Sequence, residues 1–242
     1  MKFLSLDLAH RTYADIGAVL IESQENAEPA KYEIVPLEKY ETGAPEPSRL
    51  VSRLLALSLE HGVKLILLDG PQGWKDPETD LLYCRRCERE LNTPAKTGLP
   101  GIVKPASYTR FVEFSISVFD ELHLRGWSRF DKTTWFADQP TTIETFPLSA
   151  WRSLNMKPLP SKARAKHNDI VHYYERLVGE GYLERGIQPN HDQLQALVAG
   201  LSGVGLSTSP LLTCKAYGVP AHTVEDIWRE GYIVNPIKRA DR

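Results

Sequence analysis

The chain has 242 residues, of which 42% are hydrophobic and 25% are charged, and its formal net charge at pH 7 is −2. This composition predicts a globular protein with one large domain or two small ones. The net charge excludes a general polycation, so a nucleic-acid partner would have to bind a local basic patch.

Three further features narrow the class of protein. No apolar run is long enough to cross a bilayer, so we expect no membrane partner. Three cysteines are too few for a disulfide framework and favour a reducing compartment. The first residues carry a strand pattern that includes Asp7 rather than a signal peptide, so we expect a cytoplasmic protein. These features leave the oligomeric state open.

The first predicted strand, Phe3 to Ala9, carries a carboxylate inside an apolar run. Leu4, Leu6 and Leu8 alternate on one face, and Asp7 falls on the other. A run this apolar predicts a central strand that is covered on both faces. An unpaired charge there is costly, so Asp7 is either held by a buried salt bridge or a helix cap, or it binds a metal ion.

The following elements extend this strand into a mixed sheet. Strands predicted over Ile16–Ile21 and Tyr32–Leu37 form an antiparallel meander with it. Apolar residues at helical spacing predict a helix over Leu50–Leu59, which ends at Gly62. A buried strand, Val63–Asp69, comes next, and a right-handed crossover through the helix makes it parallel to the first strand.

The remainder is predicted as a large insertion at about 70–138 and a return to the sheet. We expect helices over 81–91, 107–124, 162–178 and 191–204, a strand over 141–147 and a short edge strand over 232–234. The fold class is therefore α/β, a single domain over 1–242 with three antiparallel strands, then parallel strands, and flanking helices.

Four acids stand out in this arrangement. Asp7, Asp69 and Glu144 lie on three separate strands, and the last two lie at carboxyl ends, where open α/β sheets build their sites. Asp192 lies in the first turn of the helix over 191–204. The helix dipole alone also favours an acid at this position. Asp192 is therefore either a site residue or an acid that only stabilises the helix.

Five short motifs carry a resemblance to a known family. They are Leu6-Asp7-Leu8-Ala9, Leu68-Asp69-Gly70-Pro71-Gln72-Gly73, Arg85-Arg86-Cys87-Glu88, Ile143-Glu144-Thr145-Phe146-Pro147 and His191-Asp192-Gln193-Leu194-Gln195-Ala196-Leu197. In this order they resemble domain-of-unknown-function family 429 (DUF429), a family of predicted nucleases with the ribonuclease H-like fold. The resemblance runs through most of the chain.

The resemblance implies a metal-dependent site. It implies that Asp7, Asp69 and Asp192 are ligands of Mg²⁺ or Mn²⁺, with two ions or one, and that Glu144 completes the catalytic acids or orients a ligand. Such families often carry a second acid one turn into the last helix, where this chain has Gln195. An amide binds Mg²⁺ less well than a carboxylate does, so this departure bears on the metal count and on activity.

The chemistry that follows is phosphodiester hydrolysis by a nuclease or phosphodiesterase, in which two ions roughly 3.5–4 Å apart activate water and stabilise the leaving oxygen. Carboxylates are the ligands that such hard ions prefer. We expect substrate contacts from a set that combines basic residues, one acid of the Arg85 motif and a proton carrier. This set is Arg85, Arg86, Glu88, Lys104, Lys162, Lys166 and His191, with Arg110 as a further cation.

Several alternatives remain open at this point. Lys162 and Lys166 have the spacing of an ordinary pair on a solvated helix face. Cys84 and Cys87 have the spacing of half a zinc site. The chain is either an enzyme or a catalytically weak nucleic-acid or nucleotide-binding module of the same fold, which Gln195 favours. The substrate can be DNA, RNA or a small phosphoester.

Overall fold

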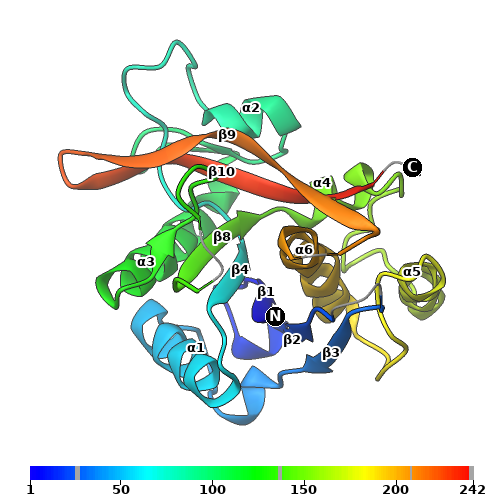
Figure 1. Ribbon diagram of the computed structural model, residues 1–242. Helices are drawn as coiled ribbons and strands as arrows, with labels where there is room; N and C mark the ends of the chain where they lie inside the picture. The colour runs from blue at the N-terminus through cyan, green and yellow to red at the C-terminus, as the bar shows by residue number, and fades with distance from the viewer. Residues whose placement is uncertain (25–27, 136–137, 208, 240–242) are drawn as a thin grey trace.

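A mixed β-sheet forms the centre of the molecule (Figure 1). The computed structural model describes residues 1–24, 28–135, 138–207 and 209–239. Within these residues the main sheet has eight strands, in the order β3-β2-β1-β4-β8-β10-β9, and β7 also pairs with β8. Its strands are β1 Lys2–Asp7, β2 Gly17–Glu22, β3 Lys31–Ile34, β4 Leu65–Asp69, β7 Ser128–Arg129, β8 Thr141–Thr145, β9 Leu212–Val224 and β10 Ile227–Lys238, and a separate pair is β5 Lys96–Thr97 and β6 Val103–Lys104.

Helices cover both faces of the sheet. They are α1 Pro47–His61, α2 Arg86–Leu91, α3 Thr109–Leu124, α4 Pro147–Ser153, α5 His167–Gly179 and α6 His191–Leu206, with short 3-10 turns at Tyr13–Asp15, Leu37–Lys39 and Ala106–Tyr108. Helices α1 and α3 pack with the face that carries Leu4 and Leu6, and α4, α5 and α6 pack with the face that carries Phe3. The alternation predicted for β1 therefore separates two hydrophobic cores.

For the first four strands, the predicted order and directions are confirmed. Strands β1, β2 and β3 are antiparallel neighbours, and β4 is parallel to β1 on its other side. Strand β8 is parallel to β4, and β10 is parallel to β8. Helix α1 ends at Gly62, whose φ of +67° is the left-handed conformation that glycine adopts without strain.

Other boundaries differ from the prediction. The short edge strand over 232–234 is wrong, because these residues lie inside β10, which pairs with β8 on one side and with β9 on the other. The helix expected over 81–91 begins only at Arg86, and the one over 162–178 begins at His167. Helix α4 was not predicted. Its seven residues begin at Pro147, which starts a helix as readily as it ends a strand.

Helix α6 lies against the sheet at van der Waals distance. Its N-terminus is capped by Asn190 and Gln193, which exchange hydrogen bonds, and most of its residues are buried. At Gly17, the residue of β2 that pairs with Asp7, a Cβ would lie 2.1 Å from the backbone oxygen of Asp192. Because glycine stands here, the first turn of α6 reaches the carboxyl end of β1.

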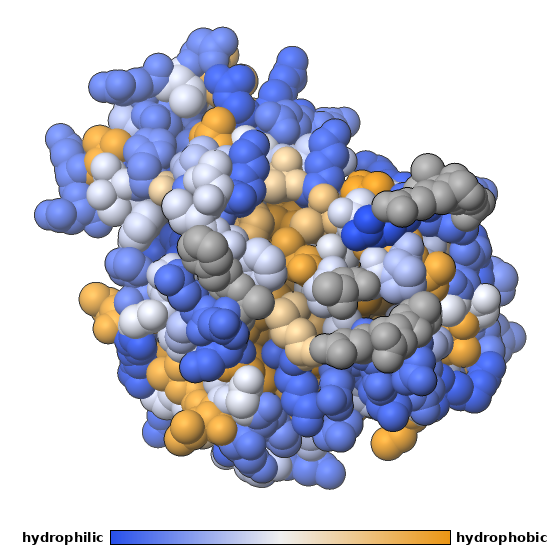
Figure 2. Space-filling model, viewed as in Figure 1, coloured by the Kyte–Doolittle hydropathy of each residue, from blue (hydrophilic) through white to orange (hydrophobic). Residues whose placement is uncertain are grey.

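The surface is mostly polar on the side shown in Figure 2, where hydrophilic residues form the rim and hydrophobic ones gather toward the centre. Among the described residues, no helix is both long and apolar enough to span a membrane.

Candidate active site

Asp7 and Asp69 lie side by side on neighbouring parallel strands. They are register partners at the carboxyl ends of β1 and β4, and their side chains share the sheet face that α6 covers. Both side chains are partly buried, and each acts on the pKa of the other. Within the described residues no basic side chain forms an ion pair with either of them. The two acids therefore form a carboxylate pair that no described basic side chain neutralises by an ion pair.

The pKa values of Asp7 and Asp69 reflect their burial and the repulsion between nearby carboxylates. Burial raises the pKa of Asp7 well above its ordinary value of 3.8, and the charges of Asp69 and Asp192 raise it further. Burial likewise raises the pKa of Asp69 to about 7. At neutral pH the pair therefore favours retaining a proton, which a metal ion would displace.

Asp192 approaches this pair from the first turn of α6, but its carboxylate is already occupied. Its Oδ2 lies 2.5 Å from the Lys162 ammonium, and its Oδ1 lies 3.0 Å from His191 Nδ1. Burial alone would raise the pKa of Asp192, but the contacts with His191 and Lys162 outweigh it and lower the pKa. Lys162 also donates to Asp15 Oδ1 at 2.7 Å, so it bridges two acids at the edge of the site.

Glu144 lies on the opposite face of the sheet from Asp69. Its register partner is Leu68, and successive side chains of a strand alternate, so Glu144 points away from α6. There it forms a two-point ion pair with Arg85, with nitrogen–oxygen distances of 2.7 and 2.6 Å. The Gln72 backbone N–H donates to it as well. The part of Glu144 in catalysis stays a prediction, and its contacts favour a positioning role.

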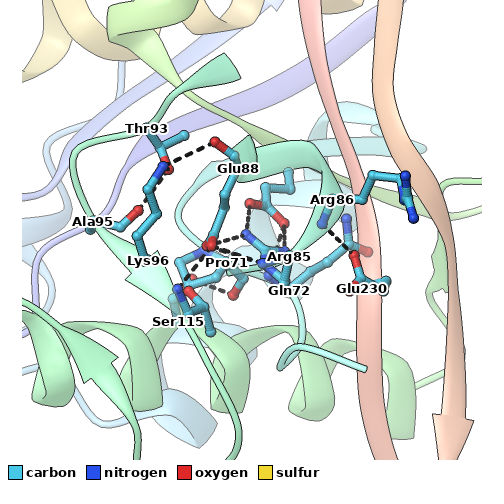
Figure 3. A network of polar contacts seen from close by, with 12 residues as sticks. Pro71, Gln72, Arg85, Arg86, Glu88, Thr93, Ala95, Lys96, Ser115 and Glu230 are labelled. Carbon is cyan, nitrogen blue, oxygen red and sulfur yellow. Dashed lines mark hydrogen bonds and ion pairs between the residues drawn. The ribbon is translucent and has the colours of Figure 1, made fainter. Parts of the chain in front are cut away.

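The same arginine anchors the segment between β4 and β8. Arg85 is 1% exposed, and it also contacts Glu88, whose carboxylate accepts from the Thr97 backbone N–H. Figure 3 shows Arg85 and Glu88 turned toward each other beside Gln72. Arg85 and Glu88, predicted to bind substrate, are therefore engaged within the protein, where they fix α2 to the sheet.

Of the other predicted substrate contacts, Lys104 and Arg86 contact residues outside the four acids, whereas His191 contacts Asp192. Lys104 places its ammonium 3.1 Å from the centre of the Tyr83 ring, and Lys166 is an exposed residue at the start of α5. The backbone of Arg86 donates to Glu230, as Figure 3 also shows. His191 joins the site by contacting Asp192, and its Nε2 lies 2.9 Å from the Pro160 carbonyl oxygen.

A cleft of about 950 Å³ opens over the carboxyl ends of β1, β4 and β8. Asp69, Glu144 and Gln195 line it, and so do apolar side chains from four parts of the chain, among them Leu8, Phe111, Phe146, Leu148 and Leu159. Gln195 accepts a hydrogen bond from the Trp151 indole at 2.8 Å. A cleft of this size, mostly apolar with a few polar groups, is typical of a site for a small molecule or for one part of a larger one.

A divalent ion fits Asp7 and Asp69 by donor chemistry, because Mg²⁺ and Mn²⁺ prefer oxygen ligands and no described basic side chain forms an ion pair with either acid. The full predicted ligand set is not assembled. In the part of the chain that the structure describes, no three His, Cys, Asp or Glu side chains are arranged to hold an ion. This also applies to the zinc alternative, since Cys84 and Cys87 are free thiols. Asp192 as third ligand stays a prediction.

Sequence reasoning missed two partners of residues that it had named: Trp151, which contacts Gln195, and Asp15, which contacts Lys162. The bond from Trp151 to Gln195 joins α4 to α6, and the bridge from Lys162 to Asp15 joins segments 147 residues apart. The only sequence signal for either was the basic run that contains Lys162. Such long-range pairs depend on how the helices pack.

No family model matches the chain, and no curated protein matches it. The resemblance to domain-of-unknown-function family 429 therefore stays a prediction. Among solved structures, the chain is similar to the Thermus thermophilus RuvC structure, with a TM-score of 0.39 and 13% identity over 82% of this chain and 90% of that one. It is similar at the same identity and coverage to T. thermophilus RuvC in complex with Holliday junction substrate, with a TM-score of 0.38. Likenesses at this level do not extend to site residues.

Proposed function

We propose that the chain is a ribonuclease H-like domain that hydrolyses phosphodiesters with a divalent ion, Mg²⁺ or Mn²⁺, held by Asp7 and Asp69. The observation that carries this proposal is the carboxylate pair on adjacent parallel strands, partly buried and without an ion-pair partner among the described residues. Two such acids repel each other and lose hydration, so a fold keeps them together at a cost. A bound cation removes that cost.

The contacts of each residue suggest its role in this reaction. When bound, the ion supplies Lewis-acid chemistry at the phosphoryl group. Asp69 lines the cleft and would hold the ion against the substrate, whereas Asp7 lies behind it on β1. Asp192 would join them as a third ligand once Lys162 releases its Oδ2. The Arg85–Glu144 pair would keep the cleft wall in place.

The substrate class within this proposal is nucleic acid or a small phosphoester. The cleft is lined by apolar and aromatic side chains, including Phe111 and Phe146, which can contact the base or sugar of a nucleotide. Binding of a duplex requires a long basic surface. Arg85 does not contribute to such a surface, because it is buried and paired with Glu144.

A second candidate function is a binding module of the same fold that has lost most of its activity. The observation that favours it is the occupation of Asp192 by Lys162 and His191, together with an amide at Gln195 that is bound to Trp151. In this case the acids would hold one ion weakly or none, and the cleft would bind a nucleotide without cleaving it.

An assay of phosphodiester hydrolysis separates the two functions. The metal-free protein is incubated with Mn²⁺ and with single-stranded DNA, single-stranded RNA, duplexes or a chromogenic phosphodiester. We expect cleavage by wild type and loss of most of the rate in Asp69→Asn, because the ion loses a ligand. Glu113→Gln, which neutralises an exposed acid on α3, is the matched control.

Gln195→Asp tests the second candidate directly. If the site is a weakened nuclease, the added carboxylate tightens Mn²⁺ binding and raises the rate, although the variant loses the bond from Trp151. Inactivity of both wild type and Gln195→Asp on every substrate, with either ion, would overturn the enzymatic proposal. Nucleotide binding by the same proteins would then support the binding module.

A further inference from the structure

A smaller hollow adjoins the main cleft beyond the end of β1. Its lining residues are His10, Arg11, Ala44, Ala106, Ser107 and Arg110, none of which is an acid. Three of them, His10, Arg11 and Ser107, line the main cleft as well, so the hollow and the cleft share a wall.

The hollow carries positive charge that the protein does not neutralise. Arg11 and Arg110 are both exposed, and neither forms an ion pair or a side-chain hydrogen bond with any residue that the structure describes. Burial and the charges of Arg11 and Arg110 lower the pKa of His10, so the two guanidinium groups act on one point. Guanidinium groups placed in this way are typical donors to phosphate oxygens.

The hollow is also close to the carboxylate pair. His10 follows Asp7 by three residues, so their Cα atoms are at most about 10 Å apart. The His10 ring packs against Phe111 of the main cleft, with ring centres 6.3 Å apart. Because His10, Arg11 and Asp69 all line the main cleft, one extended ligand can reach both the hollow and Asp69.

We propose that His10, Arg11 and Arg110 form an anion subsite for a phosphate group that neighbours the phosphodiester held at the carboxylate pair. The inference rests on the proposed function, and it narrows the substrate to a compound with two nearby phosphates, such as a nucleotide strand with a phosphate on the 5′ side of the scissile bond. The main cleft then takes the intervening sugar and base.

Binding of two dinucleotides in EDTA tests the subsite without metal. One carries a 5′-terminal phosphate and the other lacks it, and calorimetry measures both with wild type and with Arg11→Ala/Arg110→Ala. We expect the phosphate to tighten binding to wild type by about tenfold or more and to add nothing in the double variant. Arg152→Ala, an exposed arginine outside both cavities, is the matched control and should keep the full effect.

Other outcomes overturn the inference. The subsite is refuted if wild type binds neither dinucleotide, if the phosphate adds nothing, or if the double variant keeps the difference. Inorganic pyrophosphate, measured alone, distinguishes the source of the phosphate, because binding as tight as that of the phosphorylated dinucleotide would mean that the strand contributes nothing. The proposed metal function fails separately, through loss of Mn²⁺ binding by wild type.

Discussion

The carboxylate pair predicts an unusual pH dependence of stability, which Asp69→Asn should weaken. Asp69 has an ordinary pKa of 3.8 and a pKa of about 7 in the folded, metal-free protein. The folded state therefore holds a proton that the unfolded chain has already released between these values. Protonation of Asp69 favours folding, so its contribution to the free energy of unfolding falls as the pH rises from about 4 to about 7. Asp7 acts in the same sense, because its pKa is raised as well.

The size of this loss of stability follows from the difference between the two pKa values of Asp69. For Asp69, about three pH units at about 1.4 kcal/mol each give a loss of about 4 kcal/mol. Asp192 acts in the opposite sense, because its pKa is lowered, and its contribution is lost as the pH falls below about 4, outside this window. An Asn at 69 does not titrate, and it also relieves the repulsion that Asp7 experiences.

Urea unfolding in EDTA at several pH values measures the effect. We expect wild type to lose stability from about pH 4 to about pH 7 relative to Asp69→Asn, and saturating Mn²⁺ to remove the difference in slope. Equal slopes for wild type and Asp69→Asn in EDTA would refute the reasoning, since they would mean that the two carboxylates do not share a proton.

Three further changes test the parts around this pair. Gly17→Ala should lower the free energy of unfolding by about 1–3 kcal/mol, since its Cβ would lie 2.1 Å from the Asp192 backbone oxygen, and stability equal to wild type would contradict the close packing of α6. Arg85→Ala should cost about 3–5 kcal/mol in urea unfolding, because Glu144 is left buried and unpaired, whereas a loss below about 1 kcal/mol would show that water replaces the arginine. Lys162→Met should tighten Mn²⁺ binding by roughly two- to fivefold in calorimetry, because the competing ammonium is half exposed, and unchanged affinity would exclude Asp192 as a ligand.

The order of the first four strands could be predicted from local patterns. Strand β1 alternates cleanly, helix α1 ends at a glycine, and α6 begins with a capping pair, so each element carries its own signal. The positions of Asp7 and Asp69 followed, because a crossover through α1 makes their strands parallel and places their carboxyl ends at one edge.

The rest depended on pairing across long distances. The β9–β10 hairpin lacks a continuous apolar run, since Gly218, Pro220 and Pro236 interrupt it, and only Tyr232–Val234 looked like a strand. Arg85 was read as a substrate contact because the sequence does not reveal its partner Glu144, 59 residues away. The role of a buried charged residue can be predicted only when its partner in the fold is known.

Mn²⁺ titration into the metal-free protein by calorimetry tests the central claim most directly. It is done above pH 7, where Asp69 is ionised, on wild type, Asp69→Asn and the Glu113→Gln control. The carboxylate pair predicts saturable binding of at least one ion by wild type and by Glu113→Gln, with loss of that binding in Asp69→Asn. Absence of binding in wild type, or equal binding by Asp69→Asn, would contradict a metal site at Asp7 and Asp69.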